Sequence, residues 1–161
     1  MAELKYLVSH CLLTVEGRNY TIEDVLRWHT DPVSRGGRGW RKPGYSDVFY
    51  IDGSIHNLIP FDQDNEVDSW EISNGARGIN GVSRHYAYVG GLDKSGKDKD
   101  TRTREQKASE ETYVKYMVLR HPNIQIMGHY QAPNTKKTCP NYNVPQWLRS
   151  IGIPERNIFK S

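Results

Sequence analysis

The chain has 161 residues and is 36% hydrophobic, which supplies enough apolar material for one core and not for two. The formal net charge of +3 is only weakly basic, so it does not demand a strongly charged polymer such as nucleic acid as a partner, although an anionic substrate is compatible with it. No apolar run approaches the ~20 residues of a membrane span, and the first ten residues, MAELKYLVSH, do not form a secretory signal. We therefore expect a single domain, residues 1–161, that is synthesised in the cytoplasm without a signal peptide and has no nucleic-acid or membrane partner.

The first third of the chain predicts a strand, a helix and a hairpin. The segment from Leu4 to His10 is apolar enough for a buried strand. Thr21 is a suitable cap for a helix that Pro32 ends. Residues 33–45 contain four glycines and a proline, which predict a loop without regular structure. The Asp52-Gly53 pair between two apolar runs, 48–51 and 54–59, indicates a tight hairpin.

The remainder predicts two helices and two strands. Residues 60–81 and 93–104 are polar and predict loops, the second one solvated, and residues 85–89 between them predict a strand. A capping-box pattern from Thr103 to Gln106 opens the longest helix, which Pro122 stops. A strand over 124–127 and a short helix over 144–148 follow. Strands that alternate with helices, together with one hairpin, predict an α/β fold with a mixed central β-sheet flanked by helices.

The segment GHYQAPNTKKTCP contains the donors of a candidate metal site. His129 and Cys139 are its second and its second-last residue, and imidazole with thiolate suits Zn²⁺ better than Mg²⁺ or Ca²⁺. His10, at the end of the first strand, is the best candidate for a third ligand. Three protein ligands leave one position open, as in catalytic zinc sites. Lys137, two residues before the thiol, is a cation that is able to meet a developing oxyanion.

The two cysteines, Cys11 and Cys139, are too few for a disulfide framework. A bridge between them is the alternative to the metal site. Because Cys11 follows His10 directly, the two side chains point to opposite faces of a strand, so we expect Cys11 to be a reduced, buried side chain that faces away from the metal.

A basic and aromatic cluster occupies the loop 33–45. It contains Arg35, Arg38, Trp40, Arg41 and Lys42. Two interpretations stay open, a solvated loop or the wall of a groove that binds a polar or anionic substrate.

Motifs along nearly the whole chain resemble those of the zinc-dependent N-acetylmuramoyl-L-alanine amidases, and in particular the phage T7 lysozyme-like type with the peptidoglycan recognition protein fold. In chain order they are Val8-Ser9-His10-Cys11, Ile22-Glu23-Asp24, Arg27-Trp28-His29, Gly39-Trp40, Gly44-Tyr45, Asp52-Gly53 with Ile55, Tyr88-Val89-Gly90-Gly91, Asp100-Thr101-Arg102-Thr103 with Gln106, Gly128-His129 and Lys136-Lys137-Thr138-Cys139-Pro140. The resemblance implies the T7 lysozyme-like amidase fold and cleavage of the amide between N-acetylmuramic acid and L-alanine in peptidoglycan, as an endolysin or cell-wall amidase.

The resemblance also implies a site. Zinc is then held by His10, His129 and Cys139, and Tyr45 joins Lys137 as a catalytic residue, in the role of a hydrogen-bond donor because a tyrosine of pKa ~10 is a poor base at neutral pH. Asp47 is a candidate for a second polar layer around the site. Four other histidines, His29, His56, His85 and His121, are not expected to be ligands, and Lys136 is expected to be solvated.

The chain departs from the family pattern at three places. Gly44-Tyr45 is followed by Ser46-Asp47, where the family commonly has histidine and an aromatic residue. Tyr130-Gln131 follows His129, and Leu12-Leu13 stands where small or hydroxyl residues are usual. None of these changes touches the three expected ligands, so they bear on substrate preference and turnover.

Two other functions are compatible with the resemblance. The first is a module that binds peptidoglycan without cutting it, against which the retention of Cys139 and Lys137 argues. The second is a regulator that binds RNA polymerase, which no feature of the sequence confirms or excludes. An amidase of this type, expected to be a monomer, acts on the cell wall after release or delivery from the cytoplasm.

Overall fold

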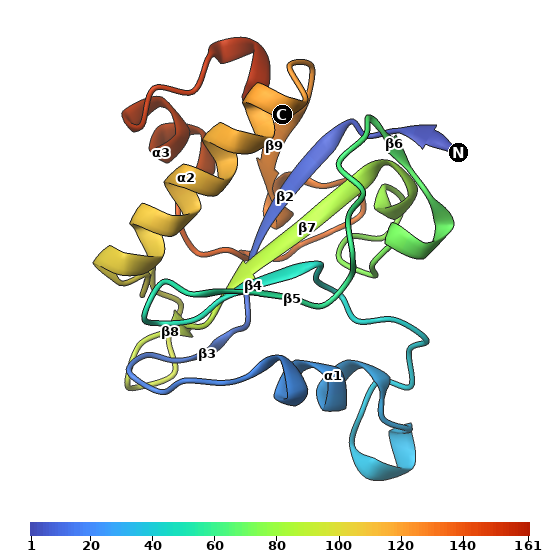
Figure 1. The fold of residues 1–161 in the computed structure, drawn as a ribbon. Helices are drawn as coiled ribbons and strands as arrows, with labels where there is room; N and C mark the ends of the chain where they lie inside the picture. The colour runs from blue at the N-terminus through green and yellow to red at the C-terminus, as the bar shows by residue number, and fades with distance from the viewer.

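A computed structural model describes all 161 residues and has a five-stranded mixed sheet at its centre (Figure 1). The strand order is β5 (Ile55–Asn57), β4 (Asp47–Phe49), β7 (Ser83–Tyr88), β2 (Tyr6–Cys11) and β9 (Gln125–Gly128). Neighbouring strands from β4 to β9 are parallel, and only the hairpin strand β5 is antiparallel. The predicted α/β class with a mixed sheet is therefore confirmed.

Helices cover both faces of this sheet. On one face, α2 (Arg104–Arg120) and α3 (Val144–Ser150) pack in one apolar cluster with side chains of β2, β7 and β9, among them Leu7, Tyr86 and Ile126. On the other face, α1 (Ile22–Thr30) contributes Val25 to a cluster with Val48. Figure 1 shows α2 and α3 together, and α1 apart from them beyond β4 and β5.

The helix boundaries follow the capping signals in the sequence. Thr21 caps α1 and Thr103 caps α2, each in a reciprocal capping box with the residue three positions later. The second helix ends at Arg120, two residues before Pro122, because the residue before a proline disfavours the helical conformation.

The predicted hairpin is present, and its tip packs on α2. Gly53 has φ +86°, and a Cβ there would lie 2.8 Å from the carbonyl oxygen of Glu105. Both the positive φ and the close approach require glycine at this turn. The hairpin therefore docks onto the first turn of the long helix.

Short elements lie within the predicted loops. Two pairs of two-residue strands are added, β1 (Ala2–Glu3) with β6 (Glu66–Val67) and β3 (Thr14–Val15) with β8 (Gly91–Leu92). Five single 3₁₀ turns cover Val33–Arg35, Ser69–Glu71, Asn80–Val82, His129–Gln131 and Glu155–Asn157. The expectation that 33–45 has no regular structure is thus wrong at its start, where the chain completes one 3₁₀ turn before the first glycine.

The loop 93–104 also differs from expectation, because Arg102 is buried rather than solvated. Its guanidinium forms ion pairs with Asp100 and Glu110 and lies 3.4 Å from the centre of the Tyr142 ring. The paired carboxylates and the aromatic face compensate the loss of hydration. This arginine thereby connects the loop to α2 and to the segment before α3.

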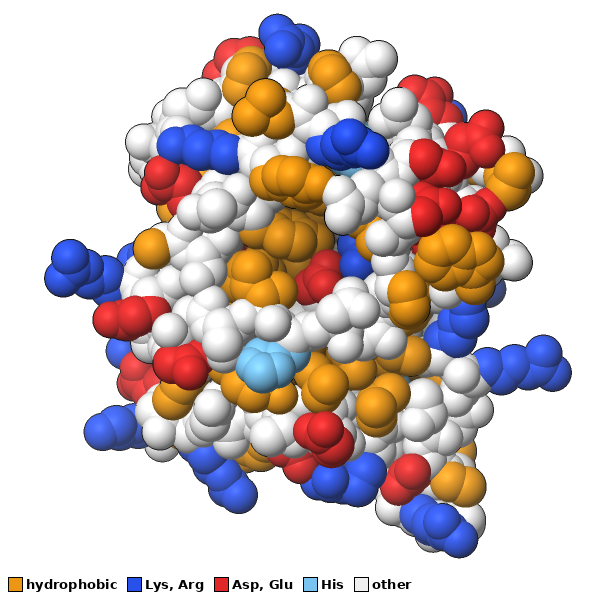
Figure 2. Space-filling model, in the orientation of Figure 1, with side chains coloured by type: hydrophobic (Ala, Val, Ile, Leu, Met, Phe, Trp, Pro, Cys, Tyr) orange, Lys and Arg blue, Asp and Glu red, His pale blue; other side chains and the backbone are white.

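The distribution of charged side chains over the surface agrees with the modest net charge. Figure 2 shows lysine and arginine side chains spread around one face, with acidic side chains between them rather than one basic patch. None of the helices has the length and apolar character needed to cross a membrane.

Candidate active site

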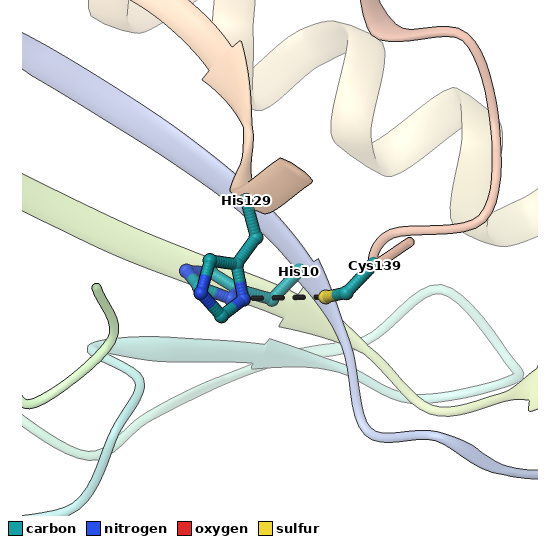
Figure 3. Close-up of side chains that lie close together, drawn as sticks. All are labelled: His10, His129 and Cys139. Atoms are coloured by element: carbon teal, nitrogen blue, oxygen red, sulfur yellow. Dashed lines mark hydrogen bonds between the residues drawn. The ribbon is translucent and has the colours of Figure 1, made fainter. Parts of the chain in front are cut away.

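The three candidate metal ligands converge at the carboxyl ends of two neighbouring strands. His10 is near the end of β2 and His129 directly follows β9, and the parallel register pairs Ser9 with Gly128. The two imidazole centres are therefore only 4.6 Å apart. The loop after β9 returns Cys139 to them, with its Sγ 3.8 Å from His10 Nδ1 (Figure 3). Candidate ligand atoms of all three residues lie within 4.8 Å of one another.

This donor set fits a zinc ion. Two imidazole nitrogens and one sulfur that face a common point form a zinc-type set, and three protein ligands are the number found in catalytic zinc sites. His10 is almost fully buried, and burial lowers its pKa, which keeps the ring neutral with a free lone pair. Hydrogen bonding from the Cys11 side chain, with further hydrogen bonds from the histidines, holds the pKa of Cys139 well below its usual value and favours the thiolate.

Cys11 lies on the other face of β2 from His10, as strand alternation predicts. Its side chain belongs to the same apolar cluster as Leu7, and a Cβ on Gly91 would lie 2.6 Å from its Sγ. It is nevertheless close to the site, because its backbone N–H donates to Cys139 Sγ at 3.2 Å and its thiol hydrogen-bonds the same sulfur. Both cysteines are free thiols in the structure, so the alternative of a Cys11–Cys139 disulfide is not observed.

A cleft of about 690 Å³ opens over the three ligands. Its walls include Arg38 and Trp40, whose guanidinium and indole stack at 5.0 Å, and Trp28. Part of the basic loop thus forms a groove wall, as one of the two interpretations expected. The other three basic residues of that loop, Arg35, Arg41 and Lys42, do not line the cleft.

Tyr45 stands in the wall of the cleft beside the ligands. Its ring centre is 5.2 Å from that of His10, and its hydroxyl donates a long hydrogen bond of 3.4 Å to the carbonyl of Cys11. Burial raises the pKa of Tyr45, so the phenol keeps its proton at neutral pH. The ring of His29 supports this segment, since its Nδ1 accepts the N–H of Gly44 at 2.9 Å.

Lys137 also lines the cleft, and it separates the cleft from a second, shallower hollow of about 520 Å³. That hollow is lined by polar and aromatic side chains, among them Asp98, Tyr130 and Asn141. Lys136 and Lys137 are both exposed, but Lys136 lines neither hollow. The contrast agrees with the expectation that only the second of the two lysines belongs to the site.

The expectation that Asp47 supports the site is wrong. Its carboxylate is buried in an ion pair with Arg84 at 3.1 Å and accepts the hydroxyl of Tyr113 at 2.9 Å. Tyr113 belongs to α2, which covers the opposite face of the sheet from His10. Asp47 therefore stabilises the packing of α2, and strand alternation leaves Ser46 on the face that carries the histidines.

Sequence analysis missed one residue next to the ligands. His85 on β7 is fully buried, and its Nδ1 lies 2.9 Å from His10 Nε2. It is not one of the three ligands, as expected, but it is their direct neighbour. The sequence signal for this contact was a histidine in each of two predicted strands. The pairing of these strands in the sheet brings the two histidines together. His56 and His121 lie elsewhere, against Tyr50 and Asn65 respectively.

No family model matches the chain, but related proteins do. The endolysin of Enterobacteria phage K11 is 23% identical over 148 residues, which cover 92% of this chain and 87% of the phage protein. The endolysin of Escherichia phage T7 is 22% identical, over 86% of this chain and 81% of that protein. These matches extend over nearly the whole chain, in agreement with the extent of the motifs.

Solved structures share the fold. The N-acetylmuramoyl-L-alanine amidase LysC from Clostridium intestinale superposes with a TM-score of 0.66 at 19% identity, over 95% of this chain and 88% of LysC. The peptidoglycan recognition protein PGRP-SA of Apis mellifera superposes with a TM-score of 0.69 at 14% identity, over 100% of this chain and 88% of that chain.

The fold is the one shared by a solved N-acetylmuramoyl-L-alanine amidase and a peptidoglycan recognition protein. More narrowly, the chain is similar over most of its length to the endolysins of phages K11 and T7. The resemblance that the motifs indicated is therefore confirmed.

Proposed function

We propose that this chain is an endolysin that uses zinc to hydrolyse the amide bond between N-acetylmuramic acid and L-alanine in bacterial peptidoglycan. The observation that carries the proposal is the convergence of His10, His129 and Cys139 in a cleft whose wall contains Tyr45 and Lys137. The relatives named endolysin and the neighbour named N-acetylmuramoyl-L-alanine amidase support the same reaction. An endolysin of this kind acts on the cell wall after its release.

Zinc is the metal that the site suits. His10, His129 and Cys139 would hold it, and three protein ligands leave a position for water or for the substrate. When bound, it would supply Lewis acidity, which activates water and polarises the carbonyl of a poorly reactive amide.

Tyr45 and Lys137 are assigned to the transition state. Attack on an amide carbonyl places negative charge on its oxygen, and a fixed donor or cation stabilises that charge more than it stabilises the neutral substrate. Tyr45 supplies a neutral O–H because burial raises the pKa of its phenol. Lys137 supplies a positive charge from the rim of the same cleft.

The cleft wall suits a muramoyl peptide. Trp28 and Trp40 present aromatic rings of the kind that sugars and peptides pack against, and the Arg38 guanidinium matches the carboxylates of a stem peptide. These side chains bind and orient the substrate, and they exclude water from the floor of the cleft.

The test is the digestion of purified sacculi in the presence of added Zn²⁺. Amidase activity releases new amino groups and yields free peptides and unsubstituted glycan strands that mass spectrometry identifies. His129→Gln should be inactive, and the matched control His56→Gln, which alters a histidine outside the cleft, should retain wild-type activity. Products with new reducing sugar ends, or with peptides cut within the stem, would contradict the assigned bond.

Binding without cleavage is the second candidate, because neighbours with this fold include PGRP-LE and the PGRP-LCa and PGRP-LCx pair, whose structures contain tracheal cytotoxin. The candidate zinc ligands argue against it, since recognition alone has no need of a buried thiolate beside two imidazoles. Tight binding to sacculi without released amino groups, in zinc-loaded protein, would favour this function over the amidase.

A further inference from the structure

His10 and His85 form a buried pair next to the candidate metal site. Val8 pairs with His85 across β2 and β7, so His10, two residues along β2, is a diagonal neighbour of His85 on the same face of the sheet. Both rings are shielded from solvent, at 1% and 0% exposed. A single hydrogen bond of 2.9 Å joins His10 Nε2 to His85 Nδ1.

The two nitrogens of His10 face different partners. Nδ1 lies 3.8 Å from Cys139 Sγ and is therefore the nitrogen that faces the metal site. A neutral imidazole carries one proton, so an Nδ1 that gives its lone pair to a metal leaves the proton on Nε2. That Nε2–H then donates to the free lone pair of His85 Nδ1, which fixes both the tautomer and the tilt of the His10 ring.

His85 is held by packing rather than by further hydrogen bonds. Its other nitrogen, Nε2, is buried and has no hydrogen-bond partner. The backbone of Gly75 presses against the ring so closely that a Cβ at this glycine would lie 2.3 Å from His85 Nδ1. A buried histidine with one unpaired nitrogen costs stability, so its one hydrogen bond, to His10, is the contact in the structure that accounts for a histidine at this position.

Ser46 explains why the space for this ring exists. It lies beside His85, directly before β4, with its N–H bound to the His85 carbonyl at 2.8 Å and its Oγ 3.4 Å from the His85 amide nitrogen. Its side chain is small and leaves room on this face of the sheet for the imidazole of His85. The imidazole next to His10 on this face comes from the neighbouring strand β7.

We propose that His85 is a positioning residue for the metal site. Its Nδ1 accepts a hydrogen bond from the Nε2–H of His10, and this hydrogen bond orients His10 Nδ1 toward the metal. The inference rests on the metal site of the proposed function. It predicts that the loss of the acceptor weakens metal binding even when the shape of the side chain is kept.

The experiment measures Zn²⁺ affinity by competition with a chromophoric chelator, in the full chain and without substrate. His85→Leu keeps a buried side chain of similar size but no acceptor, and affinity should fall 10- to 100-fold, the range usual for an outer partner of a ligating histidine. His85→Asn places Oδ1 at the level of the original Nδ1, and should stay within about threefold of wild type. His121→Leu is the control, since His121 is another buried histidine with an unpaired Nε2, away from the cleft.

The outcomes are distinct. Unchanged affinity in His85→Leu, equal losses in His85→Leu and His85→Asn, or a loss as large in His121→Leu would each overturn the role of His85. A wild-type chain that binds no Zn²⁺ would instead refute the metal site itself, before any His85 variant is compared.

A second measurement needs no variant and so does not depend on folding of the mutants. Two-bond ¹H–¹⁵N correlation spectra of the zinc-loaded wild-type protein report which ring nitrogen of each histidine carries a proton. The expected result is a proton on Nε2 of His10 and no proton on Nδ1 of His85. A proton on His85 Nδ1, or metal on His10 Nε2, would overturn the proposal.

Discussion

The backbone N–H of Cys11 donates a hydrogen bond of 3.2 Å to the sulfur of Cys139. The end of β2 thus contacts this sulfur through the side chain of His10 and through both the main chain and the thiol of Cys11. Because an amide donor favours the charged form of a sulfur, this contact helps to hold Cys139 as a thiolate. The contact ties the loop that carries Cys139 to the same strand that carries His10.

Cys139→Ser should lose zinc and amidase activity together. A hydroxyl is a far weaker zinc ligand than a thiolate, and two histidines alone are too few for a tight site. Metal content after gel filtration, measured beside amino-group release from sacculi, checks this expectation. Full activity of the variant in the presence of a chelator would rule out a metal mechanism.

Cys11→Ala should retain one zinc per chain and keep amidase activity. The backbone N–H that reaches Cys139 is preserved, and so is the contact from His10, so the sulfur keeps both when the hydrogen bond of the Cys11 thiol is lost. Removing the thiol should cost on the order of 1 kcal/mol of unfolding free energy, measured by chemical denaturation. A Cys11–Cys139 disulfide mapped in active protein would contradict both this prediction and the zinc site.

Much of the fold could be predicted from local patterns. The helix cap at Thr21, the capping box at Thr103 and the Asp52-Gly53 turn are short-range signals whose physics is complete within a few residues, and all three are confirmed. The burial of Arg102 could not be predicted in this way. Glu110 lies eight residues away on α2 and Tyr142 is distant in sequence, so only the tertiary structure reveals that a charged loop residue is paired with both.

The candidate site shows the same division. The ligand types and the motif spacing identified His10, His129 and Cys139, which the structure brings together. Asp47 was assigned wrongly because its neighbour in sequence, Tyr45, stands in the cleft wall, whereas its own carboxylate pairs with Arg84. Partners from another strand, such as His85 beside His10, require the strand order of the sheet.

Glu110→Gln should flatten the pH dependence of stability between about pH 5 and pH 8. Burial raises the pKa of Glu110 from 4.5 to about 7, although the adjacent Arg102 opposes the shift. In this window the folded state holds a proton that the unfolded state has released, so the contribution of Glu110 to stability falls as pH rises.

The measurement compares unfolding free energies of wild type and Glu110→Gln across this pH range. The stability of the wild type relative to the variant should decline with pH, by on the order of 1–3 kcal/mol in total. Glu111→Gln, an exposed neighbour on the same helix, is the control and should show no such trend. A difference that grows with rising pH would have the wrong sign for a raised pKa.

Tyr45→Phe should keep zinc and bind muramoyl peptide nearly as wild type does, while turnover falls about 10²- to 10³-fold, as when one oxyanion donor is removed. The ring contacts with His10 and His29 remain in phenylalanine, so the loss isolates the hydroxyl. Single-turnover cleavage at pH 7 and pH 9 is the measurement. Because burial raises the pKa of Tyr45, the hydroxyl stays protonated at both pH values. A wild-type rate that depends on ionisation of this hydroxyl would contradict the donor role.

Lys137→Ala is the sharpest test of the transition-state assignment, because Lys136 beside it offers a matched control. Both lysines are exposed, but only Lys137 lines the cleft. A positive charge close to a dication is unfavourable at rest and becomes favourable when the substrate oxygen gains negative charge, which is the condition for lowering a barrier. Turnover should therefore fall about 10²- to 10³-fold in Lys137→Ala with a nearly unchanged binding constant, and Lys136→Ala should behave as wild type. If Lys137→Ala instead weakens binding and leaves the single-turnover rate intact, Lys137 is a substrate anchor and takes no part in stabilising the oxyanion.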